Sequence, residues 1–392
     1  MRLVGVIAEY DPFHRGHAWQ LRQAREKAGA DAVVVVMSAA FTQRGSAAML
    51  APRVRAEMAL RGGADAVIAL PALWSLRDGE HFALAGVSLL QGLGCDALSF
   101  GAEEADVARL RLAAHVLEEQ PEDYRRILQQ ELRRGNSWAR ASAAALEAVQ
   151  PGLGACVSQP NNLLGISYLR ALERLQASME VFPVLRKGSY HAAAPGEAEF
   201  ASASAVRAAV HRGDWLSVRN WLPEDSAVLL ERAAREGQLA APNALDQALL
   251  YRLRTMTEAE WQCLPGLSEG IEGRLQKAAR SASTVDELLR LAVCARYPAA
   301  RLRRMGAHAL LGITREMTEA TPLPPAALLL GLRREVPGLQ ARLAQGQIPL
   351  LSRAAEYPEA DWLKLEERAW DVQALSLGLG CGTLRSGRLV TL

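Results

Sequence analysis

The stretch that decides the fold is Leu3–Ala8 (LVGVIA), together with the nine residues Glu9–His17 (EYDPFHRGH) that follow it. The first six residues form a short apolar run of the kind that makes a buried strand. The pattern from His17 to about Ala28 predicts an amphipathic helix. A strand, a polar turn and a helix in this order indicate the start of a β-α-β unit.

The same alternation continues through the first half of the chain. Continuous apolar runs predict further strands at residues 32–37, 66–70, 97–100 and 181–185. Helical patterns predict helices at residues 54–61, 81–91, 201–211 and 217–235. We therefore expect an α/β fold, with a Rossmann-like parallel sheet in a first domain over residues 1–239.

The second half of the chain has a different pattern. Residues 240–243 (AAPN) are predicted to be a linker, and residues 240–392 to form a mainly helical C-terminal domain. The helices expected there cover residues 245–254, 271–281, 285–292, 299–311 and 325–345. The pattern of the last stretch, residues 362–392, is ambiguous between helix and strand.

Composition excludes several classes of protein. The net charge of +2 argues against a protein that coats nucleic acid along its whole surface, although a local basic face is compatible with it. The five cysteines are scattered without a CxxC pair, which argues against a zinc site or a disulfide framework. We find no signal peptide pattern and no apolar run of the roughly 20 residues that a membrane span needs. A cytoplasmic protein is expected.

The turn after the first strand carries the chemistry that we consider most specific. His14 and His17 lie three residues apart, so both can face one ligand at the start of the helix. Free N–H groups and the helix dipole favour phosphate there, and Gly16 allows close approach. Two solvent-facing histidines are the alternative. An HxGH sequence between an N-terminal strand and a helix favours catalysis by His14 and His17 at an α-phosphate.

A second basic and hydroxyl-rich group lies downstream. Arg186 and Lys187 follow the last predicted strand, and Ser202 and Ser204 open a helix that carries Arg207 one turn further on. Serines at this position cap a helix or bind phosphate, and capping is the simpler interpretation for the serines alone. Together with the upstream HxGH sequence they indicate a phosphate site.

Several segments along the chain fit one known pattern: Glu9–His17, Met37–Gly45, Ser99–Gly101, Gln159–Ile166 (QPNNLLGI, the PNN segment), Arg186–His191, Leu267–Gly270 and residues 295–304. Together they resemble the bacterial tRNA(Met) cytidine acetate ligases, which belong to the HxGH nucleotidylyl-transferase superfamily. The resemblance runs over about the whole chain, and the N-terminal turn and the PNN segment are its most specific parts.

The resemblance implies an activity and a set of ligand contacts. Such enzymes use ATP to convert acetate to acetyl-adenylate, and then transfer the acetyl group to N4 of the wobble cytidine of elongator tRNA(Met). Mg²⁺ is expected with the triphosphate on general grounds, and no dedicated metal cage is expected in the protein. The residues that we expect at ATP are Ile7, Ala8, Glu9, Tyr10, Phe13, His14, Gly16, His17, Gln20, Gly101, Asn161, Arg186, Lys187, Ser202 and Ser204.

RNA contacts are expected in the helical second half. Arg301 and Arg304 fall on one face of a predicted helix, close to Arg296 and Tyr297. Arginines there can meet backbone phosphates, and the tyrosine can stack on a base. A solvated helix face is the alternative for this stretch alone, and the family resemblance favours RNA.

The chain departs from the usual pattern of the family at three places. Ala39 and Ala40 stand where Gly-Asn is usual, so an amide that would contact the ligand or select the carboxylate is missing. Asp11 stands where Asn is usual, and its charge near a triphosphate is unfavourable unless it is paired. Residues 51–53 (APR) lack the usual acidic residue and lysine.

Two alternative functions stay open from the sequence. One is a nucleotidyltransferase of the HxGH type that acts on a small molecule, and the other is an inactive homologue that binds nucleotide or RNA. The first would leave the arginine-rich helical half without a role. The sequence alone leaves the oligomeric state undetermined.

Overall fold

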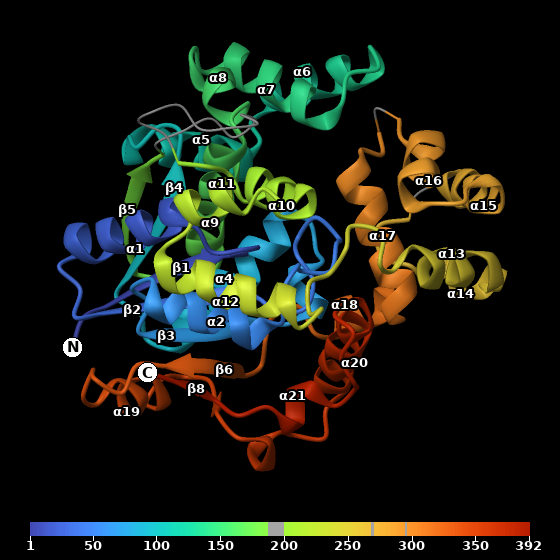
Figure 1. The fold of residues 1–392 in the computed structure, drawn as a ribbon. Coiled ribbons are helices and arrows are strands. Elements are labelled where there is room, and N and C mark those ends of the chain that lie inside the picture. Colours follow the sequence, from blue (N-terminus) through green and yellow to red (C-terminus); the bar gives the residue numbers. More distant parts are fainter. Residues whose placement is uncertain (187–199, 268–269, 295) are drawn as a thin grey trace.

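The computed structural model describes residues 1–186, 200–267, 270–294 and 296–392. One twisted sheet lies at its centre, with helices on both faces and a separate group of helices, α13–α17, to one side (Figure 1). Within the described residues the sheet has eight strands in the order β5-β4-β1-β2-β3-β6-β7, and β8 pairs with β6. The strands are β1 (Leu3–Ala8), β2 (Ala32–Ser38), β3 (Ala66–Leu70), β4 (Ala97–Ala102), β5 (Glu180–Leu185), β6 (Ala327–Leu332), β7 (Leu350–Leu351) and β8 (Val390–Thr391).

The first five strands are parallel, which confirms the predicted α/β fold. Leu3 of β1 is paired with Ala32 of β2, and Val4 of β1 with Ala97 of β4. All of β2 and β3 is buried, as expected for strands whose faces are both covered by helices. Because β1 is central, its carboxyl end lies where the strand order reverses, a position at which α/β sheets bind ligands.

The first helices cover the two faces of this sheet. Right-handed crossovers place α1 and α2 on one face and α4 and α9 on the other. In agreement, the backbone of Gly5 in β1 lies directly under the Leu90 side chain of α4. The helices of this half are α1 (Arg15–Ala28), α2 (Pro52–Arg61), α3 (Ala72–Ser75), α4 (Gly79–Gly92), α5 (Val107–Glu119), α6 (Glu122–Arg133), α7 (Trp138–Val149), α8 (Leu153–Val157), α9 (Pro160–Arg174), α10 (Ala203–Arg212), α11 (Trp215–Trp221) and α12 (Glu224–Arg235).

The prediction of a helix over residues 325–345 is wrong. Residues 327–332 instead form β6, which pairs antiparallel with β3, and only α19 further on is helical. All six residues of β6 are buried, so the run AALLLGL has no polar face to reveal its period. The C-terminal part of the chain therefore completes the first sheet.

The helices between residues 246 and 311 form a second hydrophobic cluster, whereas the later helices pack on the main core. The second cluster includes Trp261, Leu275, Leu289, Tyr297 and Leu302, which are buried among α13–α17. The division of the chain at residue 240 stays a prediction. The helices here are α13 (Asp246–Thr255), α14 (Glu258–Gln262), α15 (Ile271–Ser281), α16 (Val285–Ala292), α17 (Ala299–Leu311), α18 (Arg315–Ala320), α19 (Leu339–Ala344), α20 (Asp361–Ser376) and α21 (Thr383–Ser386).

The last long helix, α20, attaches this half to the sheet domain. The buried Glu366 carboxylate accepts hydrogen bonds from the Ala72 N–H of α3 and from the Trp370 indole. The Gln373 amide donates to the carbonyls of Ala48 and Leu50. Among the described residues, we find no helix with the length and apolar character that a membrane crossing requires.

Candidate active site

A large cavity opens at the carboxyl ends of β1 and β4. Its volume is about 1200 Å³, and it extends from the β1–α1 turn to α9, α10 and the helical group around α17. The predicted residues that line it are Ile7, Ala8, Glu9, Tyr10, His14, His17, Gln20, Gly101, Asn161, Arg186, Ser202 and Ser204. Typical ligand pockets measure roughly 300–1,000 Å³, so this cavity has room for more than one small molecule.

His14 and His17 are held in place by the start of α1. His14 is the N-cap of the helix, and its Nδ1 accepts a hydrogen bond from the Gly16 N–H at 3.1 Å. The Nδ1 of His17 accepts from the His14 N–H at 3.2 Å. The two rings are stacked, with centroids 3.6 Å apart and planes inclined by 23°. Spacing along the sequence predicted that they would face one ligand, and the structure places both in the cavity lining.

These hydrogen bonds fix the tautomer of both rings. Because each Nδ1 is an acceptor, a neutral ring carries its proton on Nε2 and offers that N–H as a donor. Burial and the nearby charge of Arg186 lower the pKa of His14 to about 3. Burial, His14 and Arg186 also hold the pKa of His17 well below its usual value. At neutral pH the pair therefore presents two neutral donors.

Three further predicted residues of this turn, Phe13, Gly16 and Tyr10, have different roles. Phe13 is fully buried outside the cavity lining, with its ring edge-on to Tyr10 at 4.9 Å. A Cβ on Gly16 would lie 3.0 Å from the His14 ring, so the glycine makes room for a histidine as well as for a ligand. The Tyr10 hydroxyl is buried and has no hydrogen-bond partner among the described residues, as expected of a group that awaits a ligand atom.

The unusual Asp11 is paired. Its carboxylate lies 3.4 Å from the Arg207 guanidinium and accepts a hydrogen bond from the Met49 N–H at 2.7 Å. Arg207 also donates to the Asp11 carbonyl and, at 3.2 Å, to the Ser204 hydroxyl. The Ser202 hydroxyl caps α10 by accepting from the Ala205 N–H at 3.1 Å. The Asp11 charge, which would be unfavourable beside a triphosphate if it were unpaired, is therefore compensated by Arg207.

A buried arginine that sequence analysis missed organises the wall of the cavity. Arg55 of α2 is fully buried and donates to the carbonyls of Glu9, Ser38, Ala39 and Leu50. It therefore joins the ends of β1 and β2. No local motif marks it, because three of its four acceptors are backbone carbonyls 16 to 46 residues away in the sequence.

The segment around Phe41 forms part of the same wall. The Gln43 N–H donates to the Glu9 carboxylate at 2.6 Å, and burial raises the pKa of Glu9. Ala39 and Ala40 are fully buried and outside the lining. The departure from the family pattern at these two positions therefore lies behind the cavity wall.

The two asparagines of the PNN segment have different roles. The Asn161 amide lines the cavity, donates to Glu103 and accepts from the Arg186 guanidinium at 3.1 Å. Asn162 is buried, and its Oδ1 accepts from the N–H groups of Glu103 and Glu104. Asn161 thus faces the cavity, whereas Asn162 fixes the loop after β4. The predicted Lys187 lies outside the described residues.

The residues predicted to bind RNA are spread over several environments. Arg296 is exposed, and the Arg301 guanidinium lies 4.4 Å from the centre of the Tyr297 ring. Tyr297 is only 3% exposed inside the second hydrophobic cluster, which argues against the predicted stacking on a base. Arg304 donates to the Gln43 carbonyl at 3.3 Å, so it links α17 to the cavity wall.

Carboxylates do not gather into a metal cage in the described part of the chain. No three His, Cys, Asp or Glu side chains there form a group that could hold a metal ion. Glu9 and Asp11 line the cavity, but both accept hydrogen bonds from backbone N–H groups.

Comparison with known proteins places the chain in a family. Residues 1–379 match the HIGH Nucleotidyl Transferase family. The tRNA(Met) cytidine acetate ligase of Caldanaerobacter subterraneus is 33% identical over 91% of this chain and 90% of its own length. That of Lysinibacillus sphaericus is 31% identical over 97% of this chain and 96% of its own length. The chain belongs to the tRNA(Met) cytidine acetate ligase family.

A solved structure of this ligase family has the same fold. The crystal structure of Thermotoga maritima TmcAL bound with alpha-thio ATP is 26% identical, with a TM-score of 0.90 and full coverage of both chains. Its apo form has a TM-score of 0.92, again with full coverage. The family and the ligase class predicted from the sequence are thereby confirmed.

Proposed function

We propose that this chain uses ATP to convert acetate to acetyl-adenylate and transfers the acetyl group to N4 of the wobble cytidine of elongator tRNA(Met). The stacked His14–His17 pair at the start of α1, inside a cavity of about 1200 Å³, carries this proposal. Family membership supplies the substrate class, and the geometry supplies the roles of individual residues.

In the first step an acetate oxygen attacks the α-phosphorus of ATP. The new bond joins that oxygen to phosphorus, and the bond from phosphorus to the pyrophosphate oxygen breaks. Negative charge builds on the non-bridging oxygens as the phosphoryl group is transferred. The Nε2–H groups of His14 and His17 donate to these oxygens. As fixed neutral donors in a buried site they need little reorganisation, and one such donor is worth roughly 10²–10³ in rate.

The surrounding cations hold the triphosphate. Arg186 lines the cavity beside Asn161, and Arg207 of α10 lines it as well. Burial lowers the pKa of Arg186, but arginine keeps its charge at neutral pH. The free N–H groups of α10 add a positive helix end. Orientation of acetate and ATP against each other supplies much of the remaining rate.

Mg²⁺ is proposed to arrive with the nucleotide. In such sites this ion usually keeps several waters and is bound by substrate phosphates with one or two carboxylates. Among the carboxylates that line the cavity, Glu9 and Asp11 belong to the β1–α1 turn beside His14 and would make water-mediated contact with the ion. When bound, the ion neutralises part of the triphosphate charge.

In the second step N4 of cytidine attacks the acetyl carbon. A carbon–nitrogen bond forms, the bond from the acetyl carbon to the AMP oxygen breaks, and N4 loses one proton. The cavity reaches from His14 to Asp286 and Arg303 of the helical group, which leaves space for the RNA acceptor beside AMP. A substrate of this kind fits the predicted cytoplasmic location.

Acetate-dependent exchange of labelled pyrophosphate into ATP, without RNA, tests the first step. We expect exchange that requires acetate. Exchange with a different small acceptor in place of acetate would favour a small-molecule nucleotidyltransferase. ATP binding without any exchange would indicate an inactive homologue.

A further inference from the structure

One aromatic side chain at the cavity has no part in the steps above. Trp138 begins α7 and is 50% exposed, yet it lines the same cavity as His14 and His17. Single exposed apolar residues are normal on protein surfaces. Trp138 differs from the more exposed Leu216 and Tyr251, because both of these lie outside the cavity lining.

Basic side chains surround this tryptophan. The turn between α6 and α7 has the sequence Leu132-Arg133-Arg134-Gly135-Asn136-Ser137-Trp138-Ala139-Arg140. Arg133 and Arg140 are exposed, and within the described residues neither has an ion-pair or hydrogen-bond partner for its guanidinium. Arg134 is 71% exposed and pairs with Glu131. Exposed positive charge therefore lies next to Trp138 in the sequence, and Trp138 itself lines the cavity.

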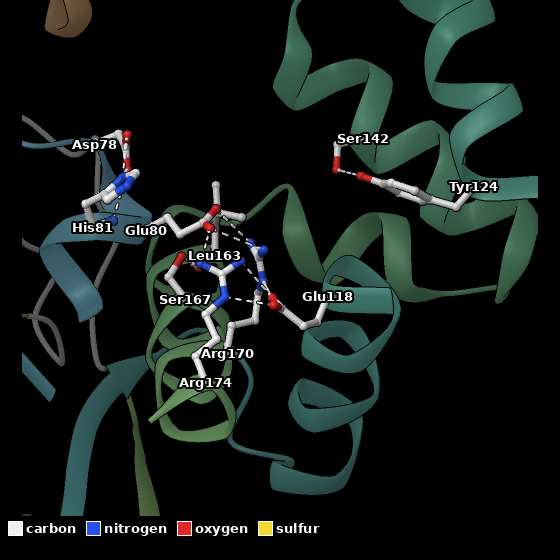
Figure 2. A network of polar contacts seen from close by, with 10 residues as sticks. All are labelled: Asp78, Glu80, His81, Glu118, Tyr124, Ser142, Leu163, Ser167, Arg170 and Arg174. Atoms are coloured by element: carbon white, nitrogen blue, oxygen red, sulfur yellow. Dashed lines mark hydrogen bonds and ion pairs between the residues drawn. The ribbon is translucent and has the colours of Figure 1, made fainter. Parts of the chain in front are cut away.

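The hairpin that carries these residues is firmly built. The Tyr124 hydroxyl of α6 lies 2.8 Å from the Ser142 hydroxyl of α7, and both side chains are buried (Figure 2). Beneath the hairpin, Arg170 and Arg174 of α9 pair with Glu80 of α4 and Glu118 of α5. Figure 2 shows these four side chains converging between the three helices. The hairpin is thus held together by a buried contact of its own, and α7 packs against α5 and α8.

The α6–α7 hairpin and helices α13–α17 are placed so that both can contact one RNA segment at the cavity. In Figure 1, α6–α8 lie above the sheet and α15–α17 to one side of it, and the cavity is lined from both parts by Trp138, Asp286 and Arg303. Single-stranded nucleic acid is bound by a positive surface that tracks phosphates and by aromatic rings on which bases stack.

We propose that the α6–α7 turn is an RNA-contact surface, on which Trp138 stacks against an unpaired base of the anticodon loop while Arg133 and Arg140 contact its phosphates. This rests on the proposed function for the identity of the RNA. The surface would hold the loop from the side opposite to α17, so that the acceptor cytidine enters the cavity between them.

The test is binding of a fluorescent anticodon stem-loop of elongator tRNA(Met), followed by anisotropy without ATP or acetate. Trp138→Ala should weaken RNA binding about 5- to 100-fold, the range for loss of one stacked base, and Trp138→Phe should restore most of it. Arg133→Ala with Arg140→Ala should lower the slope of log affinity against log salt by roughly 1.4, about 0.7 for each lost phosphate contact. Leu216→Ala and Arg235→Ala are matched surface controls.

Several outcomes would overturn the inference. RNA affinity equal to wild type in Trp138→Ala and in the double arginine variant is one. A fall in ATP affinity as large as the fall in RNA affinity is another, because it would indicate damage to the fold. A change in oligomeric state in Trp138→Ala, with RNA affinity retained, would assign this surface to a protein interface.

Failure of the proposed function is separable from failure of this inference. Weaker RNA binding by the variants, combined with no acetylation by the wild-type protein, would leave the surface standing and reject the activity. Acetylation by the wild type, combined with equal RNA binding by all variants, would support the activity and reject the RNA-contact surface.

Discussion

The imidazole of His14 lies stacked on that of His17, with ring centroids 3.6 Å apart, and the backbone fixes both Nδ1 atoms as acceptors. Two positively charged rings would repel each other at this distance, so the arrangement requires that at least one ring is neutral.

Loss of either histidine should abolish most adenylation and spare the fold. His14→Ala and His17→Ala should each lower the rate of acetate-dependent pyrophosphate exchange by about 10²–10³, because each removes one donor to the α-phosphate oxygens. His115→Ala, which changes an exposed histidine on α5, is the control. Wild-type exchange rates in both site variants would reject the mechanism.

Burial of His14 as a neutral ring predicts how stability depends on pH. Its pKa is about 3 in the folded protein and near 6.5 when exposed, so below pH 6.5 the unfolded state binds more protons. The free energy of unfolding should then fall as pH falls, by up to about 1.4 kcal/mol per pH unit for this group.

Denaturant unfolding of wild type and His14→Gln at pH 7 and pH 5 measures this contribution. The glutamine variant lacks the titrating ring, so its stability should fall less than that of wild type over the same interval. Parallel pH dependence in the two proteins would show that His14 is not buried as a neutral group.

The Asp11–Arg207 pair should control ATP binding. Arg207→Met leaves the Asp11 carboxylate uncompensated beside the triphosphate and should raise KM for ATP by about 10-fold or more. Adding Asp11→Asn should recover much of this loss, because the repulsion is then removed as well. The double-mutant cycle is measured by pyrophosphate exchange, and additive effects of the two changes would show that the residues act independently.

The two neighbouring asparagines should separate binding from stability. Asn162→Ala leaves the half-buried N–H groups of Glu103 and Glu104 without their acceptor and should lower the free energy of unfolding by about 2–4 kcal/mol. Asn161→Ala should instead raise KM for ATP with a stability change below roughly 1 kcal/mol. Urea unfolding and exchange kinetics on both variants check this, and the opposite assignment of effects would contradict the structure.

Much of the sheet could be predicted because its strands are continuous apolar runs between turn residues. Strands β1–β5 and helices α15, α16 and α17 lie where the sequence pattern placed them. The strand β6 was missed, since a buried run of leucines looks alike in a helix and a strand and its partner β3 is some 260 residues away.

The residues of the candidate site likewise fall into those that a local motif reveals and those that depend on long-range contacts. His14, His17 and Asn161 were found because they belong to local motifs. The role of Arg55 depends on carbonyls from three separate segments, and the burial of Tyr297 depends on how α15–α17 pack. Local sequence carries no signal for such long-range contacts. The same holds for Trp138, which lines the cavity only because of how α7 packs against α5 and α8.

In the proposed function, one cavity adenylates acetate and then acetylates RNA. Purified protein is incubated with ATP, labelled acetate and elongator tRNA(Met), and the tRNA is digested to nucleosides for identification of the labelled product. We predict label in N4-acetylcytidine at the wobble position, with one AMP and one pyrophosphate formed per acetyl group. Label that stays in small molecules while the tRNA remains unmodified would contradict the proposed transfer to RNA.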